Sequence, residues 1–184
     1  MRCAIIPARG GSKRIPRKNI RVFKGHPIIY WSIYAAKCVF GQDVWVSTDD
    51  PEIAGIAREH QVNVFIRDPD DGHRGTNDVA KEFLLAHPEY TECAVIYPCA
   101  PLIEPDFLWQ AIDALGFADF VVPVAKWLED PGMFYYGRSD AFLEDKPMIG
   151  PTTRMIQIPE GHGIDINDET DWRQAEQMWE ELYE

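Results

Sequence analysis

Short apolar segments of strand length alternate with segments of helical periodicity along most of the chain. This alternation is typical of the α/β class, in which crossover helices join the strands of a mostly parallel sheet. The strands that we expect are residues 2–7, 43–48, 62–66, 92–97 and 119–124. The helices that we expect are residues 27–40, a helix that begins with Pro51 after an Asp50 cap, residues 77–87 and 105–115, and a last helix from Asp168.

The segment between residues 126 and 159 departs from this alternation. It holds two short β-like pieces, 133–136 and 153–158, which are separated by turn residues. We expect this part of the chain to be antiparallel. In the last helix an apolar stripe runs from Trp172 to Leu182, and we expect it to pack on the sheet.

Composition excludes several classes of protein. Of the 184 residues 46% are hydrophobic, which is close to the average of globular domains and argues against disorder. No apolar run approaches the roughly 18 residues of a membrane span, and the start of the chain is too short an apolar run for a signal peptide. We therefore expect residues 1–184 to form a single cytoplasmic domain with no membrane partner. The four cysteines form no CxxC pair and are expected to be buried, reduced thiols.

Charge is segregated along the chain. The sequence contains 18 Lys and Arg against 30 Asp and Glu, yet residues 1–42 hold nine of the cations and none of the acids. A basic pocket on an acidic body suits a small anion, whereas a nucleic acid needs a broad basic surface. We therefore expect no nucleic-acid partner.

The loop after the first strand reads Ala8-Arg9-Gly10-Gly11-Ser12-Lys13 and continues to Lys18 with two further arginines. Ligands of open α/β sheets bind beyond the carboxyl ends of the strands, where this loop begins. Its glycines allow backbone N–H groups to approach oxygen atoms closely, and its cations supply the charge that a triphosphate needs. The loop matches neither the Walker A pattern GxxxxGK[ST] nor the dinucleotide pattern GxGxxG. The pattern indicates phosphate handling; the alternative is a basic loop that is merely solvated.

The same loop, with Ile15-Pro16 and Lys18-Asn19, resembles the signature of the cytidylyltransferases that activate nonulosonic acids, the family of CMP-sialic acid synthetases. The similarity continues, in the order and spacing of the family, through residues 46–50, 53–54, 65–67, 75–76 and 96–101. The pseudaminic acid cytidylyltransferase branch is the one that the second half of the chain resembles, at residues 132–137, 141–143, 146–147, 165–167 and 171–172.

The resemblance implies a three-layer, Rossmann-like nucleotidyltransferase fold with a mostly parallel sheet. It also implies an activity, the transfer of CMP from CTP to the anomeric hydroxyl of a nine-carbon sugar acid with release of pyrophosphate. Such a transfer requires positioning and charge stabilisation more than covalent chemistry. The residues implied as catalytic are Lys18, which would face the phosphate under attack, Arg9 and Lys13. The residues implied at the nucleotide are Ala8, Arg9, Gly10, Gly11, Ser12, Lys13, Lys18, Asn19, Arg67, Thr76 and Pro98.

On the acceptor side, the resemblance implies that Tyr97, Cys99 and Ala100 lie where the sugar acid meets the α-phosphate. The implied cofactor is Mg²⁺, held by Asp165 and Asn167 at the positions of the family's Asp-x-Asp pair. Residues i and i+2 of an extended segment share one face. Because Asn167 brings no charge, we expect weaker metal binding or more reliance on the phosphates of CTP.

Plainer interpretations of several of these residues stay open. An arginine after a strand, such as Arg67, is often a surface group, and Pro98 can serve only to shape its turn. The carboxylate of Asp165 can accept hydrogen bonds from nearby backbone N–H groups instead of binding a metal.

One departure from the family is larger. Only residues 125–131 stand where family members carry an extended arm that reaches over a partner subunit and helps to wall the sugar pocket. The homodimer that the resemblance implies is therefore an open question, as are the groups that hold the substituents of the sugar. Two alternatives to a nonulosonic acid cytidylyltransferase remain, namely a shortened, non-catalytic nucleotide-binding module and a sugar nucleotidyltransferase with a different acceptor or base.

Overall fold

The computed structural model describes residues 1–12, 14–69, 74–125 and 130–184. This part of the chain contains a seven-stranded sheet with the order β5-β4-β1-β6-β8-β7-β9, and a small hairpin of β2 and β3. The strands of the sheet are β1 (Arg2–Pro7), β4 (Val44–Thr48), β5 (Asn63–Ile66), β6 (Glu92–Ile96), β7 (Phe120–Val124), β8 (Phe134–Arg138) and β9 (Thr153–Gln157). The five strands expected in the first part of the chain are confirmed to within one residue at each end.

The sheet is mostly parallel. Strand β8 pairs antiparallel with β6 and β7, whereas β9 pairs parallel with β7. The expectation of an antiparallel segment is therefore confirmed for β8 and wrong for β9. The long connection between β8 and β9 includes helix α5 (Ser139–Leu143), and a connection of this length allows the chain to return before it re-enters the sheet. Helix α5 was not expected from the sequence.

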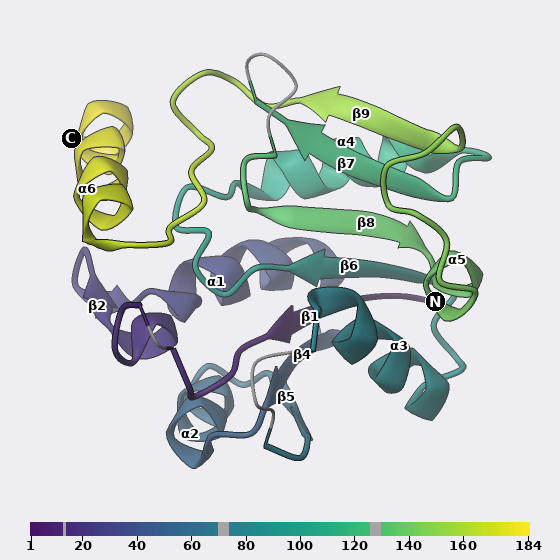
Figure 1. The fold of residues 1–184 in the computed structure, drawn as a ribbon, viewed down its shortest axis with the longest axis horizontal. Coiled ribbons are helices and arrows are strands. Elements are labelled where there is room, and N and C mark those ends of the chain that lie inside the picture. Colours follow the sequence, from purple (N-terminus) through teal and green to yellow (C-terminus); the bar gives the residue numbers. More distant parts are fainter. Residues whose placement is uncertain (13, 70–73, 126–129) are drawn as a thin grey trace.

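Helices cover both faces of the sheet and complete three layers, as Figure 1 shows. Helices α1 (Ile29–Phe40), α2 (Pro51–Glu59) and α4 (Pro105–Leu115) pack in one hydrophobic core, and α3 (Thr76–Ala86) and α5 pack in a second core on the opposite face. This arrangement confirms the expected α/β class. Among the described residues, no helix combines the length and the apolar character needed to cross a membrane.

Two helix starts follow directly from their cap residues. Asp50 accepts hydrogen bonds from the backbone N–H groups of Glu52 (2.8 Å) and Ile53 (3.1 Å), and Pro51 occupies the first helical position of α2. Asp168 caps α6 (Glu169–Tyr183) in the same way. Both helix starts were expected from the sequence and are confirmed.

Helix α6 lies beyond the carboxyl ends of the strands instead of on the sheet (Figure 1). Its buried Trp172 meets Phe23 edge to face at 5.6 Å between ring centroids, and Trp179 lies 4.2 Å from Trp31. Phe23 belongs to the hairpin of β2 (Val22–Phe23) and β3 (His26–Pro27). The expectation that the stripe packs on the sheet is therefore wrong. Trp172 and Ala175 pack in a cluster with Phe23 of the hairpin, and the remaining apolar residues of the stripe, Met178, Trp179 and Leu182, pack against the main core from outside the sheet.

The cysteines divide into two groups. Cys3, Cys93 and Cys99 are buried free thiols, as expected, but Cys38 is exposed on α1. The expectation of burial is wrong for Cys38, because it lies on the part of α1 that faces away from the core.

Candidate active site

A pocket of about 330 Å³ opens where the expected ligand loop leaves β1. Its walls come from that loop, the 3₁₀ turn η1 (Lys18–Ile20), the start of α3, the turn after β6 and the segment before α6. The residues that line it are Pro7, Arg9, Ser12, Arg14, Ile15, Lys18, Asn19, Arg67, Arg74, Gly75, Thr76, Val79, Tyr97, Pro98, Cys99, Gly132, Asp165 and Asn167. Segments far apart in the sequence thus meet beyond the carboxyl ends of β1 and β6, the place at which open α/β sheets bind ligands.

The loop after β1 is anchored to the end of β4. The N–H of Ala8 donates to the carbonyl of Ser47 (2.8 Å), and the N–H of Gly10 donates to Asp49 Oδ1 (2.9 Å). A Cβ atom at Gly10 would lie 2.4 Å from Asp50 Oδ2, so this position requires glycine. The Gly10 N–H that we expected to face a ligand oxygen is therefore engaged by a carboxylate.

Four residues expected at the ligand do not line this pocket. Ala8 and Ala100 are buried, and Gly10 packs against the acids after β4. Gly11 is exposed, with open space around its Cα. Lys13 lies outside the described residues.

The 3₁₀ turn holds Lys18 and Asn19 at the pocket. Lys18 Nζ donates to the carbonyl of Ile166 at 2.6 Å, which lies between Asp165 and Asn167. The Asn19 amide donates to the carbonyl of Arg9 at 2.8 Å. The expected catalytic lysine thus touches the segment expected to bind metal, although 148 residues separate them in the sequence.

Arg17 fixes the start of this turn. Its backbone is left-handed (φ 56°), and its guanidinium forms ion pairs with Asp50 and Glu52. The hydrogen bond from Arg17 is the main reason why the pKa of Asp50 lies below its ordinary value. The same carboxylate caps α2, so Asp50 connects the 3₁₀ turn to the helix after β4.

Asp165 and Asn167 lie side by side at the pocket. Asn167 Nδ2 donates to Asp165 Oδ2 at 2.8 Å, and the N–H of Asn167 donates to Asp171 in the first turn of α6 (2.7 Å). Gly132 (φ 63°) packs against this segment so closely that a Cβ atom there would lie 2.5 Å from the Cβ of Asp165. In the described part of the chain no group of three or more His, Cys, Asp or Glu side chains could hold a metal ion.

Tyr97 and Cys99 form the wall contributed by the turn after β6. Ser32 Oγ donates to the carbonyl of Tyr97 (2.7 Å), and the hydroxyl of Tyr97 lies 3.5 Å from that of Tyr135. Burial is the main cause that raises the pKa of Tyr97. Burial likewise raises the pKa of Cys99 to about 12, so this thiol stays protonated at neutral pH.

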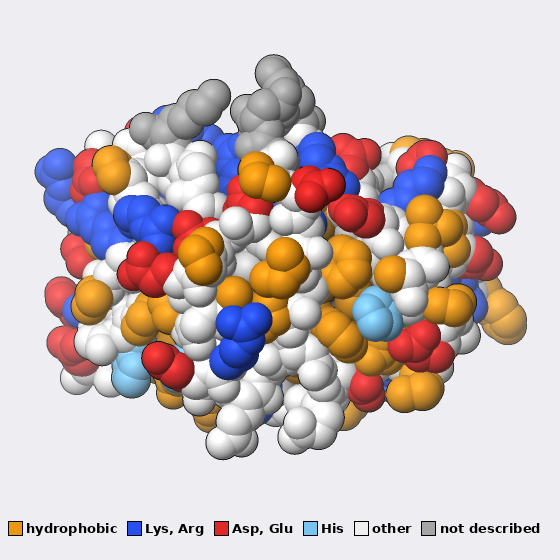
Figure 2. Space-filling view, turned by 90° about the horizontal axis from the view of Figure 1, so that it is seen from below, with side chains coloured by type: hydrophobic (Ala, Val, Ile, Leu, Met, Phe, Trp, Pro, Cys, Tyr) orange, Lys and Arg blue, Asp and Glu red, His pale blue; other side chains and the backbone are white. Residues whose placement is uncertain are grey.

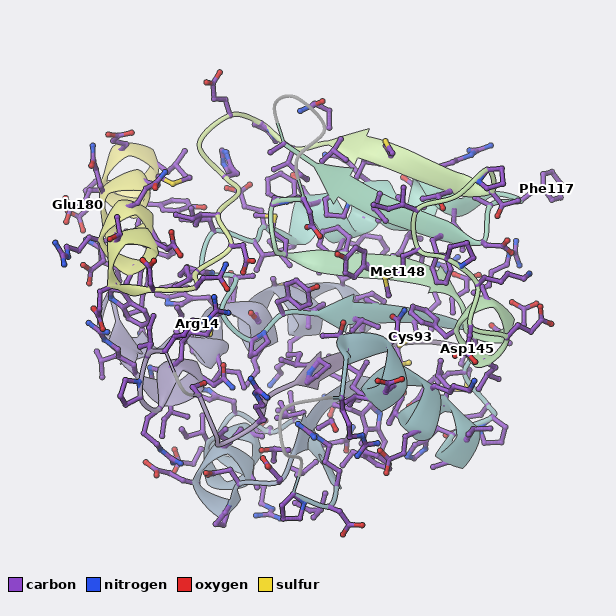
Figure 3. The ribbon with its side chains drawn as sticks, in the orientation of Figure 1. Arg14, Cys93, Phe117, Asp145, Met148 and Glu180 are labelled. Atoms are coloured by element: carbon purple, nitrogen blue, oxygen red, sulfur yellow. The ribbon has the colours of Figure 1, made fainter. Side chains whose placement is uncertain are left out.

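The lining of the pocket is strongly basic. Five cations line it, namely Arg9, Arg14, Lys18, Arg67 and Arg74, and the acid among the described lining residues is Asp165. Arg67 is only 5% exposed, which contradicts its plainer interpretation as a surface group. Figure 3 shows Arg14 on the side of the molecule where α6 lies. This lining can neutralise a polyphosphate.

Other cations of the N-terminal segment are used differently. Arg21 pairs with Glu169, and Lys24 pairs with Glu180 of α6. On the face drawn in Figure 2, likewise, acidic side chains lie beside the Lys and Arg side chains. Some of the cations in the N-terminal segment therefore form ion pairs that hold this segment to the acidic last helix, and only some of them line the pocket.

Sequence reasoning missed several lining residues. Arg14 belongs to the loop that carries the recognised motif, and its charge alone could have identified it. Gly132 could have been suspected because it stands in a segment that resembles the family. Arg74 stands just before the start of α3 and Val79 in its first turn, and the local sequence does not show that they line the pocket.

The family model described as "Cytidylyltransferase" matches residues 3–127. The chain belongs to the cytidylyltransferase family. The matched region contains the anchored loop, the 3₁₀ turn, the start of α3 and the turn after β6, and thus supplies most of the pocket. The segment before α6, with Asp165 and Asn167, lies outside the match.

Relatives and solved structures agree with this membership. Pseudaminic acid cytidylyltransferase of Campylobacter jejuni is 30% identical over an alignment of 207 positions, which covers 89% of this chain and 89% of the relative. N-acylneuraminate cytidylyltransferase A of Danio rerio is 30% identical, with 95% of this chain and 50% of the relative covered. A CMP:2-keto-3-deoxy-manno-octonic acid synthetase solved with CTP has a TM-score of 0.78 at 16% identity, with 98% of this chain and 99% of that chain covered, and it confirms the nucleotidyltransferase fold.

Proposed function

We propose that residues 1–184 act as one nucleotidyltransferase domain that transfers CMP from CTP to the anomeric hydroxyl of a nonulosonic acid and releases pyrophosphate. Membership of the cytidylyltransferase family supports the nucleotide and the reaction class. The observation that carries the proposal is the hydrogen bond from Lys18 to Ile166, because it brings the proposed catalytic lysine to the proposed metal-binding pair. We further propose that the reaction takes place in the cytoplasm, as expected from the sequence.

In the proposed reaction, the anomeric hydroxyl oxygen attacks the α-phosphorus of CTP and its proton passes to solvent. The bond between the α-phosphorus and the oxygen that bridges to the β-phosphate breaks, and pyrophosphate leaves. Negative charge develops on the oxygens of the α-phosphate during the attack, and a cation fixed in place stabilises it. We assign this role to Lys18. Arg9, Ser12 and Lys13 are proposed to bind the outer phosphates, and Arg14 adds charge at the same wall of the pocket.

Mg²⁺ is the proposed cofactor. Asp165 and the amide oxygen of Asn167 would hold it together with phosphate oxygens, a ligand set that this ion accepts. Both side chains line the pocket, which supports this fit, and the 2.8 Å hydrogen bond between them uses the amide nitrogen of Asn167, so the amide oxygen remains as the proposed ligand atom. When bound, the ion neutralises charge on the phosphates.

The rest of the pocket is assigned to the nucleoside and the acceptor. Asn19, Arg67, Thr76 and Pro98 are proposed to surround the nucleoside. Tyr97 and Cys99 are proposed to face the sugar acid, and the buried Ala100 is proposed to act through the shape of its turn. Ala8, Gly10 and Gly11 are proposed to act through the backbone path of the loop that carries Arg9.

The experiment that tests the proposal measures pyrophosphate release with Mg²⁺ and each of CTP, UTP, ATP and GTP, in the presence of pseudaminic, legionaminic, sialic or Kdo acid. We expect release with CTP and at least one nine-carbon acid, and a product with the mass of the CMP conjugate. Release with another nucleotide, or only with an acceptor of a different class, would replace the proposal by a different sugar nucleotidyltransferase.

The second candidate function is a shortened, non-catalytic nucleotide-binding module. The observations that favour it are Asn167 in place of a carboxylate and the length of the alignment with the Campylobacter protein, which at 207 positions exceeds the 184 residues of this chain. The relative therefore carries residues for which this chain has no counterpart. CTP binding by calorimetry without pyrophosphate release for any acceptor would favour the module.

A further inference from the structure

The thiol of Cys99 takes part in a buried chain of hydrogen bonds at the wall of the pocket. Its Sγ lies 3.1 Å from Asn19 Oδ1, and Asn19 Nδ2 lies 2.8 Å from the carbonyl oxygen of Arg9. Cys99 is 6% exposed and Asn19 is 5% exposed. Three segments thus meet through Asn19, namely the loop after β1, the 3₁₀ turn and the turn after β6.

The donor and the acceptor of each hydrogen bond in this buried series are determined. The carbonyl of Arg9 can only accept, so the amide of Asn19 must face it with its NH₂ group and turn Oδ1 toward Cys99. An amide oxygen can only accept, so Cys99 must be the donor. This requires a protonated thiol, which the raised pKa of Cys99 ensures at neutral pH.

Asn19 is the neighbour of Lys18 in the 3₁₀ turn. The turn is held at Lys18 by the carbonyl of Ile166 and at Asn19 by Arg9 and Cys99. Loss of the thiol would leave a buried amide oxygen without this donor and would release one of these restraints. The geometry of the lysine would then be less well fixed.

We propose that Cys99 is a positioning residue, whose thiol orients the Asn19 amide and thereby holds the 3₁₀ turn that carries Lys18 against the loop that carries Arg9. The effect of Cys99 on turnover rests on the proposed function. The effect of Cys99 on the orientation of the Asn19 amide does not depend on the proposed function, so the effect on turnover and the effect on the amide can be tested separately.

Cys93 provides a matched control. It is a buried cysteine of β6, but its Sγ lies 3.7 Å from the backbone carbonyl of Ala94 and does not line the pocket. Figure 3 shows Cys93 toward the end of the sheet away from Arg14. Cys93→Ala therefore removes a buried thiol, as Cys99→Ala does, without touching the chain through Asn19.

The kinetic test compares Cys99→Ala, Cys99→Ser and Cys93→Ala under the conditions that support turnover. We expect Cys99→Ala to lower kcat about tenfold and to raise the KM for CTP no more than about threefold. The reason is that the substitution loosens Lys18, which is proposed to stabilise the transition state. Ser supplies a hydroxyl donor at the same position, so we expect Cys99→Ser to recover kcat to within about threefold of the original chain. Cys93→Ala should leave kcat unchanged. Equal kcat values for Cys99→Ala and Cys93→Ala, or no recovery with serine, would overturn the proposal.

A second readout does not depend on turnover. Hydrogen exchange of the Asn19 side-chain NH₂ protons, followed by NMR on the full chain without acceptor, reports how firmly this amide is held. We expect faster exchange in Cys99→Ala than in Cys99→Ser, and no change in Cys93→Ala. If no acceptor supports turnover, the proposed function fails while this measurement still decides the role of Cys99; unchanged exchange in Cys99→Ala would refute it.

Discussion

Asn167→Asp tests the pair of side chains at the metal position. The substitution replaces an amide that donates to Asp165 Oδ2 at 2.8 Å by a second carboxylate of nearly the same shape. No cavity forms, so any effect arises from charge and from the lost hydrogen bond. Two unit charges about 4 Å apart repel by about 1 kcal/mol in water and about 4 kcal/mol near a protein surface. Asp165 is exposed, which favours the lower end of this range.

Without metal, we expect Asn167→Asp to lower the free energy of unfolding by about 1–3 kcal/mol at pH 7, which combines the repulsion with one lost hydrogen bond. The repulsion raises the pKa of one carboxyl above its value in the unfolded chain. The part of the destabilisation that arises from repulsion is therefore fully present at high pH and disappears as the pH falls below the unfolded value. Urea unfolding at pH 7 and at pH 3, which lies below the ordinary Asp pKa of about 3.9, measures both limits.

When a metal ion is present, the added charge of Asn167→Asp becomes favourable, because it attracts the ion. A second negative ligand should tighten binding of Mg²⁺ or Mn²⁺ by about tenfold, since charge count is a main determinant of affinity for hard cations. Calorimetry on the chain with and without CTP measures this change. Asn77→Asp adds the same charge at an exposed position in α3 and serves as the control. Unchanged metal affinity in Asn167→Asp would refute the assignment of this pair to the metal.

Three further changes test the structure around the site. Gly10→Ala places a Cβ atom 2.4 Å from Asp50 Oδ2 and should destabilise the chain by about 1–3 kcal/mol and weaken CTP binding, as thermal unfolding and calorimetry would show; a neutral result would mean that the loop is not anchored there. The hydrogen bond from Arg17 lowers the pKa of Asp50, so the ionised Asp50 contributes stability above its unfolded pKa, and this contribution is lost as the pH falls through its folded pKa. Arg17→Ala should therefore shift acid unfolding to higher pH. Acid unfolding of Arg17→Ala and of the original chain at the same pH would contradict this role. Trp172→Ala removes a buried ring that packs on Phe23 and should cost about 3–5 kcal/mol in urea unfolding, whereas a loss below about 1 kcal/mol would show that α6 is not docked on the hairpin.

The elements that the sequence predicted well are those with local signals. The first five strands of the sheet are apolar runs bounded by Pro, Gly or Asp, and the starts of α2 and α6 are set by Asp50 and Asp168, whose side chains satisfy nearby N–H groups. The ligand loop was recognisable because its glycines and cations directly follow a buried strand. Of the sixteen site residues implied by the family resemblance, eleven line one pocket.

The features that the sequence could not predict depend on contacts between distant segments. The N–H of Gly10 donates to Asp49, 39 residues away, and no local pattern distinguishes this bond from one to a phosphate. The direction of β9 depends on the length of its connection from β8, and the place of α6 depends on the apolar hairpin at Phe23. The bond between Cys99 and Asn19 joins two residues whose spacing of 80 carries no signal.

The measurement that tests the central claim most directly compares the original chain with Lys18→Ala and Lys24→Ala, in both kcat for CMP transfer and the Kd for CTP. Lys24 forms ion pairs with α6 outside the described lining of the pocket, so Lys24→Ala controls for the loss of a lysine. If Lys18 stabilises the charge that develops on the α-phosphate, Lys18→Ala lowers kcat by about a hundredfold or more and weakens CTP binding by less than about tenfold, while Lys24→Ala leaves kcat unchanged. Equal losses of kcat and CTP affinity in Lys18→Ala, or transfer that survives without this lysine, would contradict the assigned mechanism.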